Sequence, residues 1–287
     1  MPVPLLGWNA PRAEWLAARR GGLGASDVSA ALGFSTHRTP WQVAAEKTNL
    51  LLPPDGAGPA AQLGTDLEPW IIEQAPKLLG MDVARTPHML YAHSEHPWRR
   101  CSPDAFSADG WCVQAKTSGL ATPGYPHQWA DGGIPLDYEL QVRWEIHVMD
   151  APGCHLIALV AGMGLIHRPV IRDMGIEHAL VAQVDPWWKD HVINGIEPPL
   201  GAPDTDMMKF LYPRAIKEEV DLTDSPIEHW VAEYASARDD EKAAKARKDE
   251  AGANVKRLIG DATVAKSNGR KVATWSSPPS GKRALYI

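Results

Sequence analysis

Residues 101–116 carry the side chains best suited to chemistry. The stretch is typical of a β-hairpin, with the turn at residues 108–110 between two short arms. Gln114 and Lys116 are two residues apart on the returning arm, so they point to one face, and Asp104 lies across from them. An acid, an amide oxygen and a lysine at one point suit phosphodiester hydrolysis. They offer oxygen ligands for a hard divalent cation and a positive charge beside the attacked phosphate.

A sheet and flanking helices must position this hairpin. Hydrophobic periodicity, Gly stops and the pair Thr39-Pro40 predict helices over residues 12–20, 40–47, 61–79, 135–148 and 174–193. Ser26 is expected to cap a further short helix that Gly33 closes. Strands are expected at residues 81–85, 89–92, 154–161 and 168–171. This order predicts an α/β (α+β) fold with a central mixed β-sheet flanked by helices.

The C-terminal third has a different composition from the rest. We expect a core at residues 1–200, a linker at 201–224 and an appendage at 225–287. The appendage begins with a long helix from Ser225-Pro226 to about Ile259, mostly charged and alanine in its middle, and ends in a terminal hairpin. Such a composition usually indicates a solvated helix, such as one half of a helical hairpin or coiled coil.

The amino-acid composition limits which classes of protein this chain can belong to. The chain has 287 residues, of which 44% are hydrophobic and 22% charged, the proportions of a soluble globular protein. It has neither a membrane-length apolar run nor a secretory signal, and its 3 cysteines form no Cys-x-x-Cys pair, so we expect a cytoplasmic protein. The net charge of −6 argues against a generally basic surface that coats nucleic acid, but it permits a local basic pocket. Phosphate-loop and nucleophile-elbow motifs are missing from the sequence.

Four segments in order resemble the YqaJ-type viral recombinase family, relatives of bacteriophage lambda exonuclease in the PD-(D/E)XK nuclease superfamily. The resemblance covers residues 12–199 and implies a restriction-endonuclease-like core. The segments are residues 19–48, beginning Arg-Arg-Gly-Gly-Leu-Gly-Ala-Ser-Asp; residues 63–69, Leu-Gly-Thr-Asp-Leu-Glu-Pro; residues 102–116, Ser-Pro-Asp followed by Gln-Ala-Lys; and residues 134–141, Ile-Pro followed by Tyr-Glu-Leu-Gln, with Asn-Gly-Ile-Glu-Pro-Pro at residues 194–199.

The resemblance implies a catalytic site that holds two Mg²⁺ (or Mn²⁺) ions. Asp104 matches the metal-bridging aspartate of the family, and Glu68 matches an acidic position near the metals. Lys116 matches the lysine that orients or activates the attacking water. Gln114 occupies a ligand position, and the backbone carbonyl of Ala115 is a further expected metal ligand.

The resemblance also implies a set of residues that contact DNA: Arg19, Ser26, Ser102, Tyr138 and Gln141. Tyr138 and Gln141 are expected to hold the nucleic acid or the water. Arg19, Ser26 and Ser102 resemble residues that bind a terminal 5′-phosphate. An arginine suits bidentate phosphate binding, and Arg20 competes with Arg19 for this role.

Gln114 departs from the family pattern, which has a glutamate at this position. An amide oxygen still ligates Mg²⁺, but one negative charge is lost. Three explanations are open: a variant made to stop cleavage, a natural variant that works, and a natural DNA binder without activity.

The function implied is a Mg²⁺-dependent exodeoxyribonuclease, acting 5′→3′ on ends of linear double-stranded DNA in phage-type homologous recombination. The alternatives are a catalytically impaired DNA-end-binding protein of the same fold and a non-enzymatic regulatory or interaction protein. The resemblance further implies a homotrimer and a single-strand annealing protein as partner, and the lack of a membrane-length apolar run leads us to expect no association with membranes.

Overall fold

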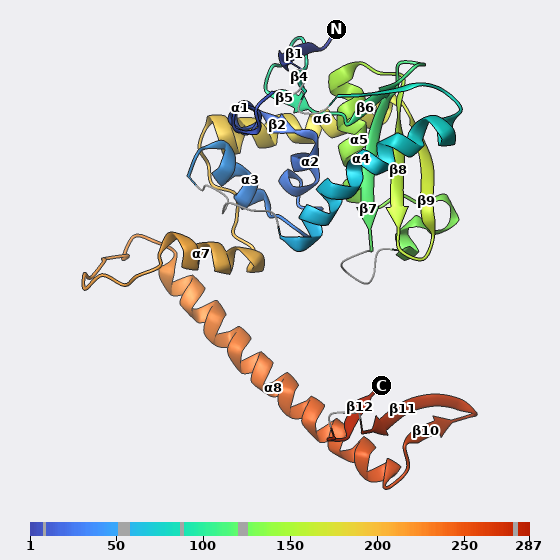
Figure 1. Cartoon of the computed structure of the whole chain (residues 1–287). Helices are drawn as coiled ribbons and strands as arrows, with labels where there is room; N and C mark the ends of the chain where they lie inside the picture. The colour runs from blue at the N-terminus through green and yellow to red at the C-terminus, as the bar shows by residue number, and fades with distance from the viewer. Residues whose placement is uncertain (8–9, 51–57, 87–88, 120–125, 278–280) are drawn as a thin grey trace. The chain divides into compact units, whose positions relative to one another are not determined.

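The chain folds into two units, Met1–Arg214 and Ala215–Ile287. The computed structural model describes residues 1–7, 10–50, 58–86, 89–119, 126–277 and 281–287 (Figure 1). The boundary between the units falls within residues 201–224, the segment expected to be a linker. In the described residues, no helix is long and apolar enough to span a membrane.

A five-stranded mixed sheet forms the centre of the first unit. Its strand order is β3-β6-β7-β8-β9, and only the β7–β8 pair is parallel. The strands are β3 (Val83–Arg85), β6 (Ala105–Ser107), β7 (Cys112–Ser118), β8 (Gly153–Val160) and β9 (Gly164–Ile171). The expected hairpin is therefore β6–β7, and the predicted mixed sheet is confirmed.

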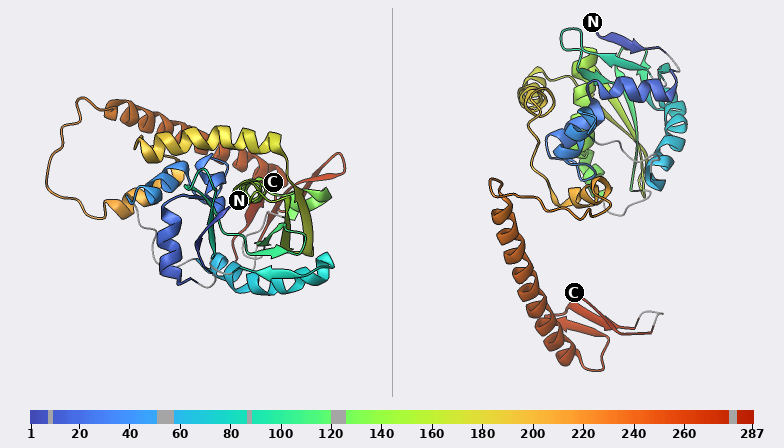
Figure 2. Two further views of the ribbon diagram at one scale, coloured as in Figure 1. Left: turned by 90° about the horizontal axis from the view of Figure 1, so that it is seen from above. Right: turned by 90° about the vertical axis from the view of Figure 1, so that its left-hand side faces the viewer.

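Different helices cover the two faces of this sheet (Figures 1 and 2). Helix α4 (Pro59–Leu79) packs Ile71 and Ala75 in one apolar cluster with Val113 of β7. Helix α5 (Leu136–Met149) packs Val142 in another cluster with Cys112 of β7. Because side chains alternate along a strand, even-numbered residues of β7 face α5.

A second, smaller sheet has the order β1-β4-β5-β2. Its strands are β1 (Val3–Leu6), β2 (Leu23–Gly24), β4 (Leu90–Ala92) and β5 (Arg99–Cys101), and the helices near it are α1 (Arg12–Arg20), α2 (Ala25–Ala31), α3 (Pro40–Lys47) and α6 (Met174–Trp188). In the parallel pair of β2 and β5, Gly24 lies beside Arg100. Residues that directly follow the two strands, including Ser26 and Ser102, are thereby brought together.

Several predicted boundaries differ in the structure. The strand expected at residues 168–171 is β9, which begins at Gly164. Helix α2 is capped by Gly24, so Ser26 is not the cap; the Asp27 carboxylate instead accepts the Gly24 N–H at 3.2 Å. The predicted helix 174–193 is α6 followed by a π-helical segment, Lys189–Ile193. Pro186 lies just before that change; because it has no N–H, it weakens the regular ladder. Short helices also form at Pro126–Gly132, Ala202–Asp204 and Thr205–Leu211 (α7).

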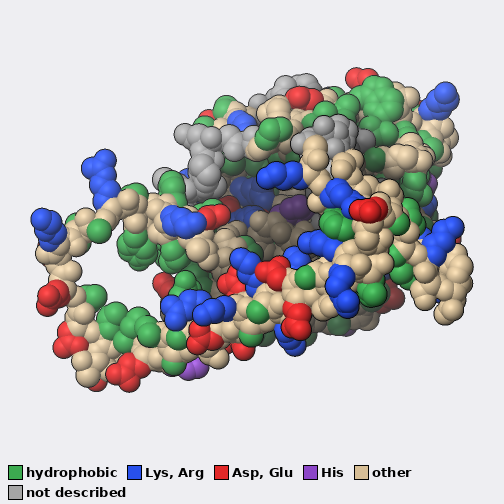
Figure 3. All heavy atoms as spheres, turned by 90° about the horizontal axis from the view of Figure 1, so that it is seen from below, with side chains coloured by type: hydrophobic (Ala, Val, Ile, Leu, Met, Phe, Trp, Pro, Cys, Tyr) green, Lys and Arg blue, Asp and Glu red, His purple; other side chains and the backbone are tan. Residues whose placement is uncertain are grey.

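The second unit contains α8 (Ile227–Ile259) and a three-stranded sheet, β10 (Val264–Ser267), β11 (Arg270–Ser276) and β12 (Ala284–Tyr286). The expected terminal hairpin missed β10. The sequence does signal this strand, because Asn268-Gly269 is a typical hairpin turn. In the structure these two residues have φ of 50° and 76°, as such a turn requires. On the face seen in Figure 3, basic and acidic side chains are interspersed.

Candidate metal and nucleic-acid site

The β6–β7 hairpin joins Asp104 to Gln114. Ala105 pairs with Val113, so the preceding Asp104 lies opposite Gln114. The Gln114 Nε2 donates to Asp104 Oδ2 at 2.7 Å, and the Ala115 N–H donates to the same oxygen at 2.8 Å. Among the described residues nothing donates to Asp104 Oδ1. One carboxylate oxygen is therefore anchored to β7 while the other remains available to a ligand.

The surroundings of Asp104 disfavour its charge. Burial raises the pKa of Asp104 to about 7, and the nearby carboxylate of Glu68 adds to this increase. Lys116 and the N–H of Ala115 oppose it. A bound cation would stabilise the ionised form.

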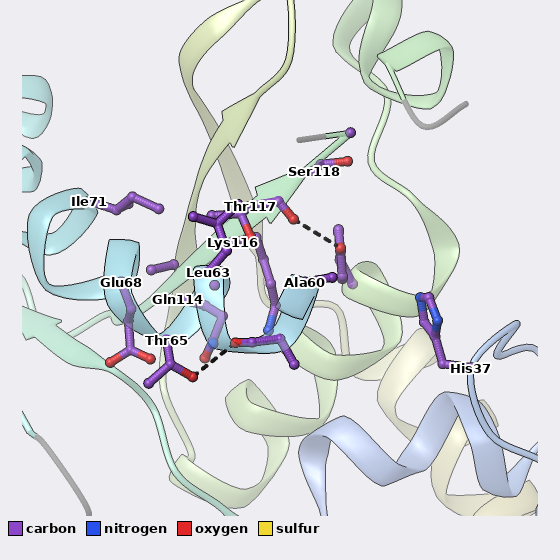
Figure 4. Close-up of a pocket in the computed structure, with 15 residues that line it drawn as sticks. His37, Ala60, Leu63, Thr65, Glu68, Ile71, Gln114, Lys116, Thr117 and Ser118 are labelled. Atoms are coloured by element: carbon purple, nitrogen blue, oxygen red, sulfur yellow. Dashed lines mark hydrogen bonds between the residues drawn. The ribbon is translucent and has the colours of Figure 1, made fainter. Parts of the chain in front are cut away.

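Two cavities meet at the hairpin. One, of about 340 Å³, is lined by residues that include Arg19, Ser26, Glu68, Ser102, Asp104, Gln114 and Gln141. The other, of about 480 Å³ (Figure 4), is lined by residues that include Glu68, Gln114, Ala115, Lys116 and Tyr138. The cavities share Thr65, Glu68 and Gln114. Each residue predicted for the site thus lines one cavity or both.

Lys116 reaches into the larger cavity beside an aromatic ring. Its Nζ lies 5.5 Å from the centroid of the Tyr138 ring, and the Tyr138 hydroxyl donates to the Thr117 carbonyl at 3.5 Å. Figure 4 shows Glu68 from α4, and Gln114 and Lys116 from β7, at the same cavity. The tyrosine therefore restrains the lysine near the hairpin without neutralising its charge.

Arg19 is held in the smaller cavity by an ion cluster. It donates to Ser26 Oγ at 2.6 Å and to Asp27 Oδ1 at 2.9 Å. Arg38 binds the same Asp27 oxygen at 2.9 Å, and the Lys47 Nζ lies 2.8 Å from Oδ2. Burial acts to raise the pKa of Asp27, but Arg19, Lys47 and Arg38 overcome it and hold that pKa well below its ordinary value. Asp27 thus fixes Arg19 in place.

The other residues predicted to contact DNA differ in how free they are to bind a ligand. Arg19 lines the cavity and Arg20 does not, which favours the first of the two alternatives. The Ser26 hydroxyl accepts from Arg19, so its proton remains available to a ligand. The Ser102 hydroxyl donates to the Met89 carbonyl, so only its lone pairs face outward.

Three charged residues of the smaller cavity were missed in the sequence: Arg12, Arg85 and Glu145. Glu145 had a detectable signal, because it lies one helical turn after Gln141 and so shares its face of α5. Gln141 Nε2 donates to Glu145 Oε1 at 2.9 Å. Burial raises the pKa of Glu145 to about 8; the Gln141 hydrogen bond opposes this effect and Asp104 adds to it.

The donor set fits a hard divalent cation. In the part of the chain that the structure describes, no three His, Cys, Asp or Glu side chains form a ready-made metal cluster. Gln114 Oε1 and Glu145 Oε2 are nevertheless buried oxygens without a hydrogen-bond partner. Carboxylate and amide oxygens are the ligands of Mg²⁺ and Mn²⁺. An ion near Asp104 would satisfy atoms that the protein alone leaves unsatisfied.

Known proteins resemble this chain in sequence and in fold. The family model of the YqaJ-like viral recombinase domain matches residues 14–152. This part of the chain, just under half of it, is similar to that family. The YqaJ-like match contains most of α1 and all of α2 to α5, including the hairpin and the three cavity-lining acids Glu68, Asp104 and Glu145. The uncharacterized protein YqaJ of Bacillus subtilis (strain 168) is 26% identical over 193 residues, which are 66% of this chain and 59% of that protein. The chain thus spans less than two thirds of that relative.

Solved structures show the same fold. The alkaline exonuclease LHK-Exo from Laribacter hongkongensis has a TM-score of 0.53 and 19% identity, over 62% of this chain and 92% of the exonuclease. LHK-Exo in complex with dAMP has a TM-score of 0.52 and 19% identity, over 69% of this chain and 96% of that structure. The predicted mixed α/β fold is confirmed.

The raised pKa values predict how the stability of the metal-free protein depends on pH. Folding favours the protonated forms of Asp104 and Glu145, whose ordinary pKa values are 3.8 and 4.5. This stabilisation is complete below those values and is lost as pH rises through about 7 and about 8. We expect urea unfolding in EDTA to give a lower free energy at about pH 9 than at about pH 5, with a smaller difference in Glu145→Gln. An equal pH dependence in the variant would contradict the assignment to Glu145.

Proposed function

We propose that this protein is a metal-dependent exodeoxyribonuclease that degrades linear double-stranded DNA in the 5′→3′ direction, in phage-type homologous recombination. One observation carries the proposal. Arg19 and Ser26 line the same cavity as Asp104 and Gln114. A cavity that combines a guanidinium and a hydroxyl with a carboxylate metal site suits a terminal phosphate at one side and a scissile phosphodiester at the other. LHK-Exo, whose fold this chain shares, has been solved in complex with dAMP.

The metal site of this proposal is built on the hairpin. Asp104, the amide oxygen of Gln114 and the carbonyl of Ala115 would hold Mg²⁺ or Mn²⁺, with Glu68 nearby. Two such ions, when bound, supply an activated water and neutralise charge on the attacked phosphate. Lys116 places a positive charge in the adjoining cavity, where it would orient the attacking water.

The DNA contacts of the proposal come from four elements. Arg19 of α1 and Ser26 of α2 would bind the terminal 5′-phosphate, with Ser102 beside them. Tyr138 would contact the nucleic acid from α5. The Gln141 amide is already bonded to Glu145, so we assign it to positioning rather than to direct DNA contact.

A second function, a catalytically impaired DNA-end-binding protein, is favoured by one contact. The Gln114 amide donates to the Asp104 oxygen at 2.7 Å. A glutamate at position 114 would instead repel Asp104, and a bound cation would relieve that repulsion. Both functions predict DNA-end binding, and only the enzyme degrades the bound end. A regulatory protein on this fold predicts neither.

The decisive experiment is the incubation of linear duplex DNA with the full chain and Mg²⁺ or Mn²⁺. One strand carries a label at its 5′ end, and a covalently closed circle of the same sequence is the control. We expect early release of labelled 5′-mononucleotide from the linear duplex, an intact circle, and no reaction in EDTA. Metal-dependent end binding without release would support the impaired binder, and cleavage of the circle would contradict an exonuclease.

Arg19 predicts a preference for 5′-phosphorylated ends. A terminal phosphate carries more charge than an internal one, so the 5′-phosphorylated duplex should be digested at least about tenfold faster than the 5′-hydroxyl duplex, equal to about 1.4 kcal/mol. Arg19→Ala should remove most of this preference. Arg20→Ala is the matched control, because this neighbouring arginine lines neither cavity. An unchanged preference in Arg19→Ala would remove Arg19 from the phosphate site.

The family resemblance supports three further parts of the proposal. We assign the protein to the cytoplasm of the bacterial or phage-infected cell, as a homotrimer that passes its single-stranded product to an annealing protein. Light scattering of the full chain tests the trimer. A monomer at the concentrations used for digestion would contradict it.

A further inference from the structure

Glu145 is a buried acid that the fold itself does not explain. It is 1% exposed, on the face of α5 that covers the central sheet. Its Oε1 accepts one hydrogen bond from Gln141, and its Oε2 has no partner. In the described part of the chain no lysine, arginine or histidine forms an ion pair with it. A buried charge without a counter-ion is destabilising, so packing alone favours an apolar residue here.

The position of Glu145 links it to the hairpin. It lines the smaller cavity together with Asp104 and Gln114. Gln114 is on the α5 side of the sheet, because it shares the parity of Cys112, which packs against that helix. The Gln114 Oε1 is also buried without a partner. Two residues that line this cavity with Asp104 therefore each carry a buried, unsatisfied oxygen, one on β7 and one on α5.

The chemistry of these two residues is complementary. The family pattern places a carboxylate at position 114, where this chain has an amide. The same cavity contains an extra carboxylate, supplied from the opposite element. We propose that Glu145 is a carboxylate of the metal site in addition to Asp104 and Glu68, so that α5 supplies the negative charge missing from position 114 and β7 supplies a neutral amide oxygen. Gln141, bonded to the other Glu145 oxygen, positions the carboxylate.

This inference rests on the proposed nuclease function, but its test measures metal binding without DNA. Calorimetric titration of Mn²⁺ into the metal-free protein should show that Glu145→Gln lowers affinity at least about tenfold, equal to about 1.4 kcal/mol. Glu139→Gln is the matched control. It removes the same charge from the same helix, but Glu139 pairs with Arg143 and lines neither cavity. We expect its affinity to stay within about twofold of the wild type.

Exchanging the two residues tests the complementarity directly. The double variant Gln114→Glu/Glu145→Gln returns the carboxylate to β7 and the amide to α5. We expect it to bind Mn²⁺ within about threefold of the wild type, although Glu145→Gln alone is weak. Mn²⁺ should also raise the melting temperature of the wild type and the double variant more than that of Glu145→Gln. A double variant as weak as Glu145→Gln would overturn the proposal.

Asp104→Asn separates failure of this inference from failure of the proposed function. If Asp104→Asn loses Mn²⁺ and Glu145→Gln does not, the metal site stands and the role of Glu145 is wrong. If Asp104→Asn binds as the wild type does, or the wild type binds no Mn²⁺, both proposals fail. If Glu145→Gln does not fold by circular dichroism, Glu145→Asp replaces it, since it keeps the charge but withdraws the carboxylate by one carbon. Its affinity should also fall, and an unchanged affinity would overturn the role of Glu145.

Discussion

Replacing Asp104 with asparagine should lower the rate of Mg²⁺-dependent digestion at least about a thousandfold, a loss of about 4 kcal/mol of transition-state stabilisation. The carboxylate is the proposed metal-bridging group, and an amide cannot supply its charge. The fold should survive, because an amide oxygen can still accept from the Ala115 N–H, which bonds Asp104 at 2.8 Å. The initial rates of digestion of linear duplex by the wild type and the variant are compared at saturating Mg²⁺. Urea unfolding at the same pH verifies that the variant is folded.

Asp109→Asn is the matched control for this prediction. Asp109 lies in the turn of the same hairpin, where it accepts from Ser107, and it lines neither cavity. Its rate should stay within about threefold of the wild type. If Asp104→Asn keeps more than about a tenth of the wild-type rate, the chemistry takes place elsewhere.

Asp27→Asn should lower the free energy of unfolding by about 3–5 kcal/mol near pH 7, because it removes the buried charge that three cations share, and only Arg38 and Lys47 keep another carboxylate, Glu46. Arg19, Arg38 and Lys47 lie within 2.9 Å of its carboxylate. The depressed pKa of Asp27 adds a pH signature. Its stabilisation is complete above the ordinary value of 3.8 and is lost as pH falls below it. The wild type and the variant should therefore converge in strong acid, as urea unfolding can measure.

Asp204→Asn provides the comparison. Asp204 is 1% exposed, but its partners are neutral: the Thr39 hydroxyl at 2.7 Å, the Gln42 amide at 2.9 Å and the Gly201 N–H at 2.7 Å. The same substitution there removes hydrogen bonds without stranding cations, so we expect a loss of about 1–3 kcal/mol. Equal losses at both positions would show that the cations around Asp27 contribute no more than neutral donors do.

The sequence alone determined the elements that carry local signals. Thr39 is followed by a proline and does cap α3, with its side chain accepting the Gln42 N–H. Gly80 ends α4 in the left-handed conformation at φ 70°. The hairpin register followed from its turn, because a short tight turn fixes which residues of the two arms face each other. These signals act within a few residues of one another and need no distant contact.

In the second sheet β4 was expected at residues 89–92, but β1 and β2 were not, because such strands depend on distant pairing rather than on local signals. β2 has only two residues, Leu23–Gly24, too few to show a period, and it exists because it pairs with β5 from a distant part of the chain. The Asn-Gly turn before β11 was a readable signal that the sequence interpretation did not use.

The residues of the candidate site also differ in whether a local sequence signal or only the tertiary structure identifies them. Asp104, Gln114 and Lys116 were readable from one hairpin, whereas the family resemblance alone suggested that Arg19 and Ser26 act with them. Only the packing of β2 beside β5 places those residues in one cavity with Asp104. For Glu145 the sequence showed one glutamate on an amphipathic helix. Glu145 is buried, carries an unpartnered oxygen and shares a cavity with Gln114 because α5 packs on the sheet. The environment of a charge is set by the elements packed around it, whatever their separation along the chain.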